Sequence, residues 1–490
     1  MSNQNPLAQS PDMKVPPPGG LVGPLSGGFT APHHALSTQF IQQSRQALLT
    51  FLASKRRPLM ANIQIVPDAL PRPHSSGRLI VLVMALFFAF GFCTVLVDTL
   101  IPKLKSLFSL TYAEAMLTQF CFFGAYFIVS LPAAKLVQRL GYLQSVTLGL
   151  MVMAVGCLSF MLAAELGVYP AFLAALFTLA CGVTIVQVAA NPLATSIGDP
   201  RTAHSRLTLA QAFNSLATTV GPIFGAAFIL GEPWTKHAVG QAGDATLQHA
   251  HSQSIQQPFL LICFALCLLA LVCWLCRSWV VPCQGNSRKL QAEARAPVWK
   301  NSRLRLGTLS IFLYVGAEVS VGSLLANYLM QPSVLALDVQ TAGGLVSVYW
   351  GAAMVGRFIG SRILRERSPG AVLMVCACGA VALACASALS SGLVAAVTII
   401  GIGLFNAIMF PTIFALAVED MQDRAAEASG MLCLAIVGGA VVPLLTGMIA
   451  DAQGLACALL APAACYVGIA VFGWRTRQPK ARTLRERDAH

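Results

Sequence analysis

Two carboxylic acids lie within long apolar stretches of the sequence. Asp98 follows the run LIVLVMALFFAFGFCTVLV, and Glu318 follows LGTLSIFLYVGA. An ionised acid at the depth of a bilayer costs roughly 2.5 kcal/mol or more, and acids at such positions usually serve a function. Both residues are therefore candidates for proton coupling, and they predict transport of an ion or of a substrate together with an ion.

The two acids differ in their expected depth. Glu318 is near the middle of its stretch, which favours burial in the membrane. Asp98 is near the far end of its stretch, just before Pro102 and Lys103, so an interfacial position is the alternative to a coupling role. A negative charge at the carboxyl end of a helix opposes the helix dipole. This cost favours the functional interpretation of Asp98.

Amide side chains form stripes on two further stretches. Thr184, Gln187 and Asn191 share one helix face, because residues separated by whole helical turns face the same side. Gln211 and Asn214 are spaced in the same way on the next stretch. Such side chains either line a substrate path or hydrogen-bond between helices, for about 0.6 kcal/mol on average. We expect the amides to bind substrate and the threonine to bond within its own helix.

Aromatic side chains could supply flat surfaces for a sugar ring. Gln119 and Tyr126 share a face of another stretch, and Trp350 lies in a later one, two turns before Arg357. Sugar hydroxyls need amide or carboxylate partners, while the C–H face of the ring packs on aromatic rings. Trp350 is either a stacking platform or a residue of the membrane interface. Arg357 is expected near the cytoplasmic end of its helix, paired with a carboxylate or a lipid phosphate.

The composition identifies the class of protein. Of 490 residues, 56% are hydrophobic and only 10% are charged, whereas soluble proteins average about 25% charged residues. We therefore expect an all-α polytopic membrane protein. Twelve apolar stretches are long enough to cross a hydrocarbon core of about 30 Å: residues 79–101, 113–134, 143–164, 171–194, 207–230, 259–281, 306–330, 340–363, 370–391, 393–418, 427–450 and 455–474.

The twelve stretches fall into two sets of six, a pattern typical of duplicated bundles with a site near the midplane. The predicted organisation is a disordered cytoplasmic tail at 1–77, a first bundle at 78–281, a basic linker at 282–305, a second bundle at 306–474 and a basic tail at 475–490. The composition of the first segment, rich in Pro, Gly, Ser and Gln, is typical of disorder. Met60 opens a conventional short tail, so we hypothesise that it is the native start.

The net charge of +13 reflects membrane topology rather than a nucleic-acid partner. Nearly all Lys and Arg residues fall in loops on the side of the two termini, which the positive-inside rule places in the cytoplasm. We expect a multi-pass protein of the cytoplasmic (inner) membrane that works as a monomer in the lipid bilayer. No histidine lies in a predicted span, and no metal-ligand spacing or nucleophile–base set is present. Neither a metal, another cofactor nor an enzymatic activity is expected.

Seven strings, in order along the chain, resemble the glucose/galactose transporters of the fucose:proton symporter family, within the major facilitator superfamily. They are FFGAYF (122–127), VQVAANP (186–192), LAQAFNS (209–215), YVGAEVSVGS (314–323), YWGAAMVGRFIG (349–360), LFNAIMFPTIF (404–414) and AIVGGAVVP (435–443). The resemblance covers residues 78–474. It implies the major facilitator fold with two six-helix bundles, alternating access, and uptake of a hexose with a cation, expected to be a proton.

The resemblance also implies roles for particular residues. Asp98 matches the first-helix aspartate that the family uses for proton coupling, and Gln211 and Asn214 match amides near the substrate. Asn406, in the string LFNAIMFPTIF, is a further amide expected to bind substrate. Gln187 stands where the fucose branch has a glutamate. Glu318 stands where that branch has a glutamine. This exchange argues against fucose as the substrate, and it suggests Glu318 as the acceptor of a sugar hydroxyl that assists coupling.

Several alternatives remain open at this level. The coupling ion could be sodium, and the cargo could be an amino sugar or another carbohydrate. A drug:proton antiporter or a sugar receptor without transport are more distant alternatives. Pro192, Pro411 and Pro443, with Gly438 and Gly439, interrupt apolar helices, and such breaks either allow close packing or act as hinges for gating.

Overall fold

The structure is a computed structural model, which describes residues 76–108, 112–225, 244–280, 297–421 and 424–477. Within its helices, the side chains at 96–107, 112–116, 222–225, 244–257 and 339–340 lie outside the described part. The predicted tails at 1–77 and 475–490, the hypothesis on Met60 and most of the predicted linker at 282–305 therefore fall almost wholly outside the described residues. The described residues contain helices and turns and no β-strand.

The first six helices form one bundle. They are α2 (Ser76–Leu107), α3 (Tyr112–Leu140), α4 (Tyr142–Leu166), α5 (Tyr169–Ser196), α6 (Ala203–Gly225) and α7 (Asp244–Leu275). Within this bundle α4 packs on α5 and α7, while α2 packs on α6. Close approach of α4 and α5 requires glycine at position 182, because a Cβ there would lie 2.5 Å from the backbone nitrogen of Met153.

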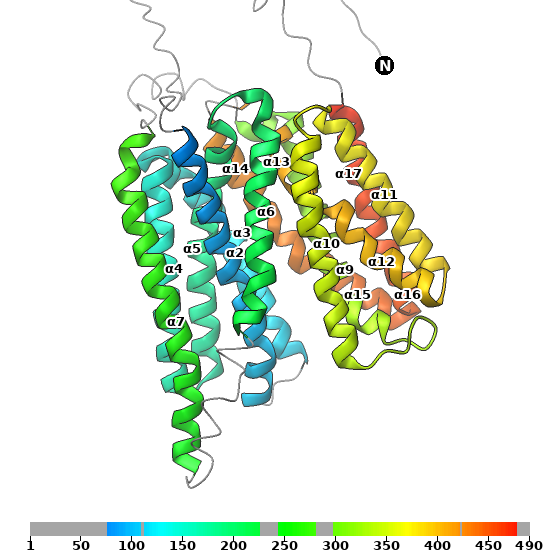
Figure 1. Cartoon of the computed structure of the whole chain (residues 1–490), viewed down its shortest axis with the longest axis horizontal. Coiled ribbons are helices and arrows are strands. Elements are labelled where there is room, and N and C mark those ends of the chain that lie inside the picture. Colours follow the sequence, from blue (N-terminus) through cyan, green and yellow to red (C-terminus); the bar gives the residue numbers. More distant parts are fainter. Residues whose placement is uncertain (1–75, 109–111, 226–243, 281–296, 422–423, 478–490) are drawn as a thin grey trace, which may run out of the picture. The chain divides into compact units, whose positions relative to one another are not determined.

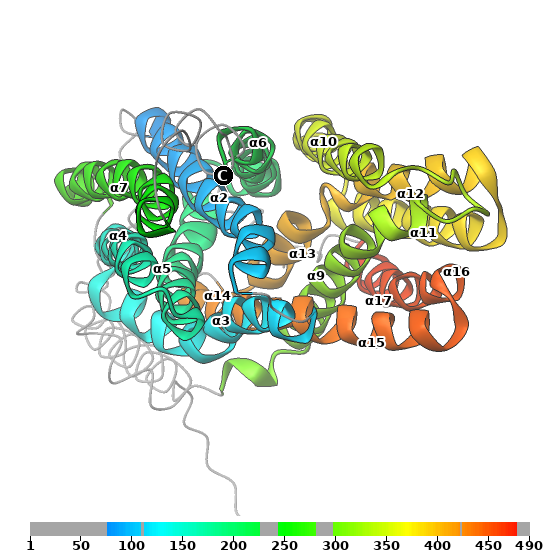
Figure 2. The same ribbon diagram turned by 90° about the horizontal axis from the view of Figure 1, so that it is seen from below.

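The second bundle contains more helices because three of its spans are broken. Its elements are α9 (Ser302–Leu329), α10 (Val339–Ile363), α11 (Pro369–Leu389), α12 (Gly392–Asn406), α13 (Met409–Val418), α14 (Ala425–Leu434), α15 (Gly438–Gln453), α16 (Leu455–Ala458) and α17 (Leu460–Thr476). The breaks lie between α12 and α13, between α14 and α15, and between α16 and α17. Helix α11 packs on α12 and α17, and α9 packs on α15 and α17. Figures 1 and 2 show the two sets of helices from two directions.

The prediction of an all-α polytopic protein is confirmed. Eleven helices of the described part are long and apolar enough to cross a membrane, and α6 occupies the remaining predicted span. The largest difference from the predicted spans is in α7, which begins at Asp244 rather than at 259. Helix α9 begins at Ser302 rather than at 306. The reason is that the side chain of Asn301 accepts hydrogen bonds from the backbone N–H groups of Arg303 and Leu304, at 2.9 and 3.1 Å, and so caps the helix.

Two of the breaks in the second bundle lie at particular residues, prolines or glycines. Between α12 and α13 the chain turns just before Pro411, which has no N–H to donate to the carbonyl of Ala407. Between α14 and α15 lies the single 3₁₀ turn Ala435–Val437. There, a Cβ at Gly438 would clash with the carbonyl oxygen of Phe312, and one at Gly439 would lie 2.6 Å from the ring of Phe123. At these two glycines the contacts favour close helix packing over a hinge for gating.

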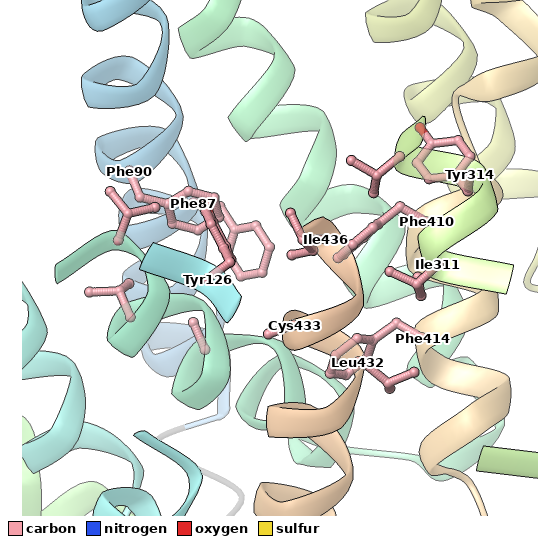
Figure 3. Close-up of a cluster of buried hydrophobic side chains, with 14 of the residues drawn as sticks. Phe87, Phe90, Tyr126, Ile311, Tyr314, Phe410, Phe414, Leu432, Cys433 and Ile436 are labelled. Atoms are coloured by element: carbon pink, nitrogen blue, oxygen red, sulfur yellow. The ribbon is translucent and has the colours of Figure 1, made fainter. Parts of the chain in front are cut away.

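The two bundles meet through a buried apolar region. Helix α14, which belongs to the second bundle, packs on α3 and α5 of the first, and α6 packs on α10 and α13. Figure 3 shows Cys433 of α14 between Tyr126 of the first bundle and Phe410 of the second. All three side chains are buried. We name the end of the molecule where α2 begins the basic end, because the turns there carry Lys135, Arg139, Arg201, Arg365 and Arg367.

Candidate functional site

Glu318 lies in the middle of α9 with two polar partners. Its side chain is 13% exposed. The hydroxyl of Tyr314, one turn earlier on the same helix, donates a hydrogen bond to Oε1 at 2.7 Å. The guanidinium of Arg357, on α10, places Nη2 3.8 Å from the same oxygen. The carboxylate is therefore neither free nor closed off, since its remaining lone pairs can still accept hydrogen bonds.

Arg357 joins Glu318 to two further segments. Its Nε donates to the carbonyl of Ala407 at 3.2 Å, which is the group that Pro411 leaves without a helical partner. Its Nη1 donates to the carbonyl of Gln211 at 3.2 Å and to the hydroxyl of Ser215, both on α6 of the first bundle. Of the two partners expected for Arg357, a carboxylate or a lipid phosphate, the structure shows the carboxylate. The side chain points into the interior and is only 10% exposed.

Gln187 of α5 forms an amide–tyrosine pair with α3. Its Nε2 donates to the hydroxyl of Tyr126 at 3.0 Å. Gln187 is partly buried, whereas Tyr126 is almost fully buried. The pair holds the amide in one orientation and leaves its oxygen as an acceptor for a ligand. The structure thus supports Gln187 as a contact residue and assigns Tyr126 to its support.

A second amide–tyrosine pair occupies the equivalent place in the second bundle. Asn406 of α12 donates from Nδ2 to the hydroxyl of Tyr349 of α10 at 2.8 Å. Gln187 and Asn406 each stand five residues before a helix proline, Pro192 and Pro411 respectively. The two pairs join the corresponding helices of the two halves. Asn406 is fully buried, and its contact with a substrate stays a prediction.

Trp350 does not lie at a helix end, and its indole packs on α9 one helical turn beyond Glu318. A Cβ on Gly322, one turn beyond Glu318 on α9, would lie 3.1 Å from Cζ2 of the indole. The ring is partly buried and meets the ring of Tyr349 edge-on at 5.2 Å. This position favours Trp350 as a platform for a sugar ring over Trp350 as a residue of the membrane interface. A carboxylate with a nearby flat ring can hold both the hydroxyls and the apolar face of a sugar.

The fold and this central polar cluster agree with the family comparison. A sequence profile described as "Major Facilitator Superfamily" matches residues 80–436. The chain belongs to the major facilitator superfamily. The relatives are named as transporters and symporters, which confirms the prediction that this member of the superfamily is not an enzyme.

Three relatives define where this superfamily member falls. A protein named "Glucose/galactose transporter" from Brucella abortus is 48% identical over 388 residues, covering 79% of this chain and 91% of the relative. An "L-fucose-proton symporter" from Escherichia coli is 31% identical, covering 80% and 91%. A crystal structure of FucP in the outward conformation gives a TM-score of 0.71 at 29% identity, covering 82% of this chain and 99% of that chain. The resemblance to the glucose/galactose branch is confirmed.

Four predicted substrate residues of this major facilitator protein lie buried or partly buried among the helices, and their contact with substrate stays a prediction. Asn191 and Asn406 are fully buried. Gln211 is 6% exposed and uses its backbone carbonyl to hold Arg357. Asn214 is partly buried and donates to the carbonyl of Phe87 on α2 at 3.1 Å. The amides of Asn214 and Asn406 thus bond between helices, whereas the buried amide of Asn191 has no described hydrogen-bond partner. Gln119 is partly buried on α3, and its role stays a prediction.

Asp98 lies in the last part of α2, and its side chain falls outside the described residues. The coupling role of Asp98 therefore stays a prediction. Four residues of the cluster were not among the predicted site residues, namely Arg357, Tyr314, Ser215 and Tyr349. Tyr314 could have been found from its spacing to Glu318, because residues four apart are neighbours on a helix. Ser215 and Tyr349 depend on the register between helices, which the sequence does not reveal.

Proposed function

We propose that this protein imports a hexose of the glucose/galactose type together with a proton, by alternating access across the cytoplasmic membrane. The observation that carries the proposal is the setting of Glu318, between Tyr314 and Arg357, with the indole of Trp350 packed on α9 one helical turn beyond it. The names of the relatives support the hexose, and that of the Escherichia coli relative supports the proton.

Sugar recognition follows from the chemistry of these groups. A carboxylate accepts hydrogen bonds from two neighbouring hydroxyls, and hydrogen bonds to a charged group contribute about 1.5–3 kcal/mol. Tyr314 and Arg357 fix the orientation of Glu318 in advance, which reduces the entropy lost on binding. The indole of Trp350 packs on the ring carbons, and the free oxygen of Gln187 accepts from a further hydroxyl. Together they favour a neutral, polyhydroxylated ligand.

Coupling to a proton follows from the cost of a buried charge. An ionised acid inside a closed bundle lacks water, and this state is unfavourable unless the charge is paired. Protonation removes the charge, so the form that carries both proton and sugar passes through the closed state more readily than the form with a bare acid. We assign the proton to Asp98 and the sugar hydroxyls to Glu318. One charge moving through 100 mV supplies about 2.3 kcal/mol.

Orientation follows from the basic end. Because Lys and Arg residues gather there, the positive-inside rule places that end, and with it both termini, in the cytoplasm. Most of the described cross-bundle hydrogen bonds lie from Arg357 towards that end: Ser205 donates to the carbonyl of Ser361 at 2.6 Å, and Ser429 donates to that of Val188 at 2.8 Å. One contact, between Oγ1 of Thr219 and Sδ of Met354 at 3.7 Å, lies on the other side of Arg357. These bonds support a state in which the basic end is closed, like the outward conformation named for the matched FucP structure.

The experiment is uptake of radiolabelled hexoses into proteoliposomes. An imposed inward proton gradient should drive accumulation of glucose or galactose, and a protonophore should abolish it. Unlabelled glucose, galactose, mannose, fucose and N-acetylglucosamine then compete, with and without sodium. Accumulation that requires sodium would replace the proton in the proposal. Expulsion of the sugar, or binding without accumulation, would contradict import.

The change Gln187→Ala should weaken sugar binding about fivefold, because one neutral hydrogen bond contributes about 1 kcal/mol. The pH dependence of uptake should stay as in the wild type, since Gln187 carries no proton. The measurement is equilibrium binding together with a pH profile of uptake. Tyr126→Phe, which removes the partner of Gln187, should produce part of the same loss. Thr178→Val is the matched control on α5, because that hydroxyl is exposed and bonds only to Ala174 of its own helix.

A further inference from the structure

The contact between α6 and α10 runs along one face of each helix. Starting at the basic end, Ser205 binds the carbonyl of Ser361 at 2.6 Å and receives Nε of Arg365 at 3.2 Å. Further in, Arg357 binds the carbonyl of Gln211 and the hydroxyl of Ser215. This contact joins the two bundles. Arg357 is the residue at which it meets Glu318, because the same guanidinium holds both.

The charges at this junction balance only while Glu318 is ionised. Arg357 is 10% exposed and Glu318 is 13% exposed, with 3.8 Å between Nη2 and Oε1. If Glu318 loses its charge, the guanidinium keeps its full charge in a site with little water. A buried charge that has lost its partner is strongly destabilising, whereas the paired form is tolerated. Hydration of Arg357 then requires that the bundles separate at α6.

We propose that Arg357 is a positioning residue that transmits the charge state of Glu318 to the contact between the bundles. Arg357 donates hydrogen bonds to Gln211 and Ser215 of α6, and we call these bonds the clasp. While Glu318 is ionised, the clasp keeps the basic end closed. When Glu318 receives the proton that enters at Asp98, the clasp weakens and the basic end opens. This inference rests on the proposed function, because it gives Glu318 a second role in the same transport cycle, after the binding of sugar hydroxyls.

A second cross-bundle bond provides an internal comparison. Pro192 of α5 cannot donate to the carbonyl of Val188, and Ser429 of α14 fills that acceptor at 2.8 Å. Ser429 is fully buried, and its described hydrogen bonds do not involve Glu318 or Arg357. This bond also holds the bundles together, but it carries no charge and should not respond to Glu318. Comparison of the two contacts therefore distinguishes an effect of the charge on Glu318 from a general loosening of the contact between the bundles.

The test is a double-mutant cycle read by hydrogen exchange of the full-length protein in lipid nanodiscs, without sugar. Glu318→Gln should speed amide exchange in residues 204–211 of α6 and 357–363 of α10 by about tenfold, which corresponds to about 1.4 kcal/mol. In an Arg357→Gln background the same change should have an effect below about twofold, because no unpaired cation remains. In an Arg357→Lys background, which keeps the charge, the response to Glu318→Gln should persist.

Two controls exclude trivial explanations. Arg362→Gln removes an exposed arginine of α10 that pairs with Glu366 in the turn after that helix, and this background should keep the full tenfold response. Ser429→Ala should speed exchange at the α5–α14 contact, and in this background too Glu318→Gln should keep its full effect. Equal effects of Glu318→Gln with and without Arg357 would overturn the proposal. So would an unchanged exchange rate in both helices after Glu318→Gln.

The cycle is read without sugar and without a gradient, so its failure is distinct from failure of the proposed function. If the protein accumulates hexose but the cycle is additive, the clasp is wrong and import stands. If the cycle is coupled but no hexose accumulates, the clasp stands and the cargo is wrong. Should Arg357→Gln not fold, Ser215→Ala removes the hydroxyl partner on α6 instead. That change should speed exchange in α6 and α10 by itself and reduce the response to Glu318→Gln.

Discussion

Replacement of Glu318 by glutamine should reduce the affinity for hexose by about tenfold or more. The change keeps the shape and one acceptor oxygen, but it removes the negative charge that strengthens hydrogen bonds from sugar hydroxyls, and such bonds contribute about 1.5–3 kcal/mol. It also leaves Arg357, 3.8 Å from Oε1, without its ionic partner. The measurement is the equilibrium dissociation constant of glucose or galactose by isothermal titration calorimetry in detergent.

Tyr314→Phe is the matched control for Glu318→Gln. It removes the hydroxyl that donates to Oε1 at 2.7 Å and leaves the carboxylate and its charge in place. Because only the orientation of Glu318 is affected, the loss of affinity should stay within about fivefold, the value of one neutral hydrogen bond. An unchanged affinity in Glu318→Gln would show that Glu318 does not contact the sugar, and its role would then be confined to Arg357.

The number and placement of the helices could be predicted because the membrane restricts what the chain can form. Every backbone N–H and C=O in hydrocarbon needs an internal partner, so a long apolar stretch becomes a helix. This explains why Glu318 was correctly placed in mid-helix. Asn301 shows the limit: its capping bonds to Arg303 and Leu304 moved the start of α9 into a segment that its charges had assigned to the linker.

The partners of the polar residues could not be predicted, because they depend on the register between helices. From spacing alone, Gln187 and Asn191 look equivalent, since both lie on one face of α5. In the structure Gln187 is partly exposed and holds Tyr126, while Asn191 is fully buried. A helix face is wider than the surface that lines a substrate path. Which part of it faces the path is set by the neighbouring helix, here α14, which packs on α5.

The two helix prolines connect the duplicated halves to the contact between them. Each proline frees a carbonyl four residues earlier, that of Val188 in α5 and that of Ala407 before α13. Ser429 reaches across the bundles to fill the first, and Arg357 fills the second while it also reaches α6. The two equivalent prolines thus have a similar role, one in each bundle. Each provides an acceptor inside the bundle that a residue at the interface can use.

Replacement of Asp98 by asparagine should abolish proton-driven accumulation of hexose while sugar counterflow continues. Asparagine cannot take up or release a proton, so the proton gradient no longer acts on the cycle. It also resembles the protonated acid, so the sugar-loaded form should still pass through the closed state. Accumulation should fall from about fifty-fold, the ratio that about 2.3 kcal/mol per 100 mV supports, to equality of the two sides.

The measurement for Asp98→Asn is paired uptake and counterflow in the same proteoliposomes, with Asp451→Asn as the control. Asp451 is an exposed acid near the end of α15 opposite the basic end, and its replacement should leave both activities unchanged. Because an interfacial acid does not pass through the closed state, the interfacial alternative for Asp98 predicts the same result as this control. Equal loss of accumulation and counterflow in Asp98→Asn would instead assign Asp98 a structural role, and the proton would then have to be carried by Glu318.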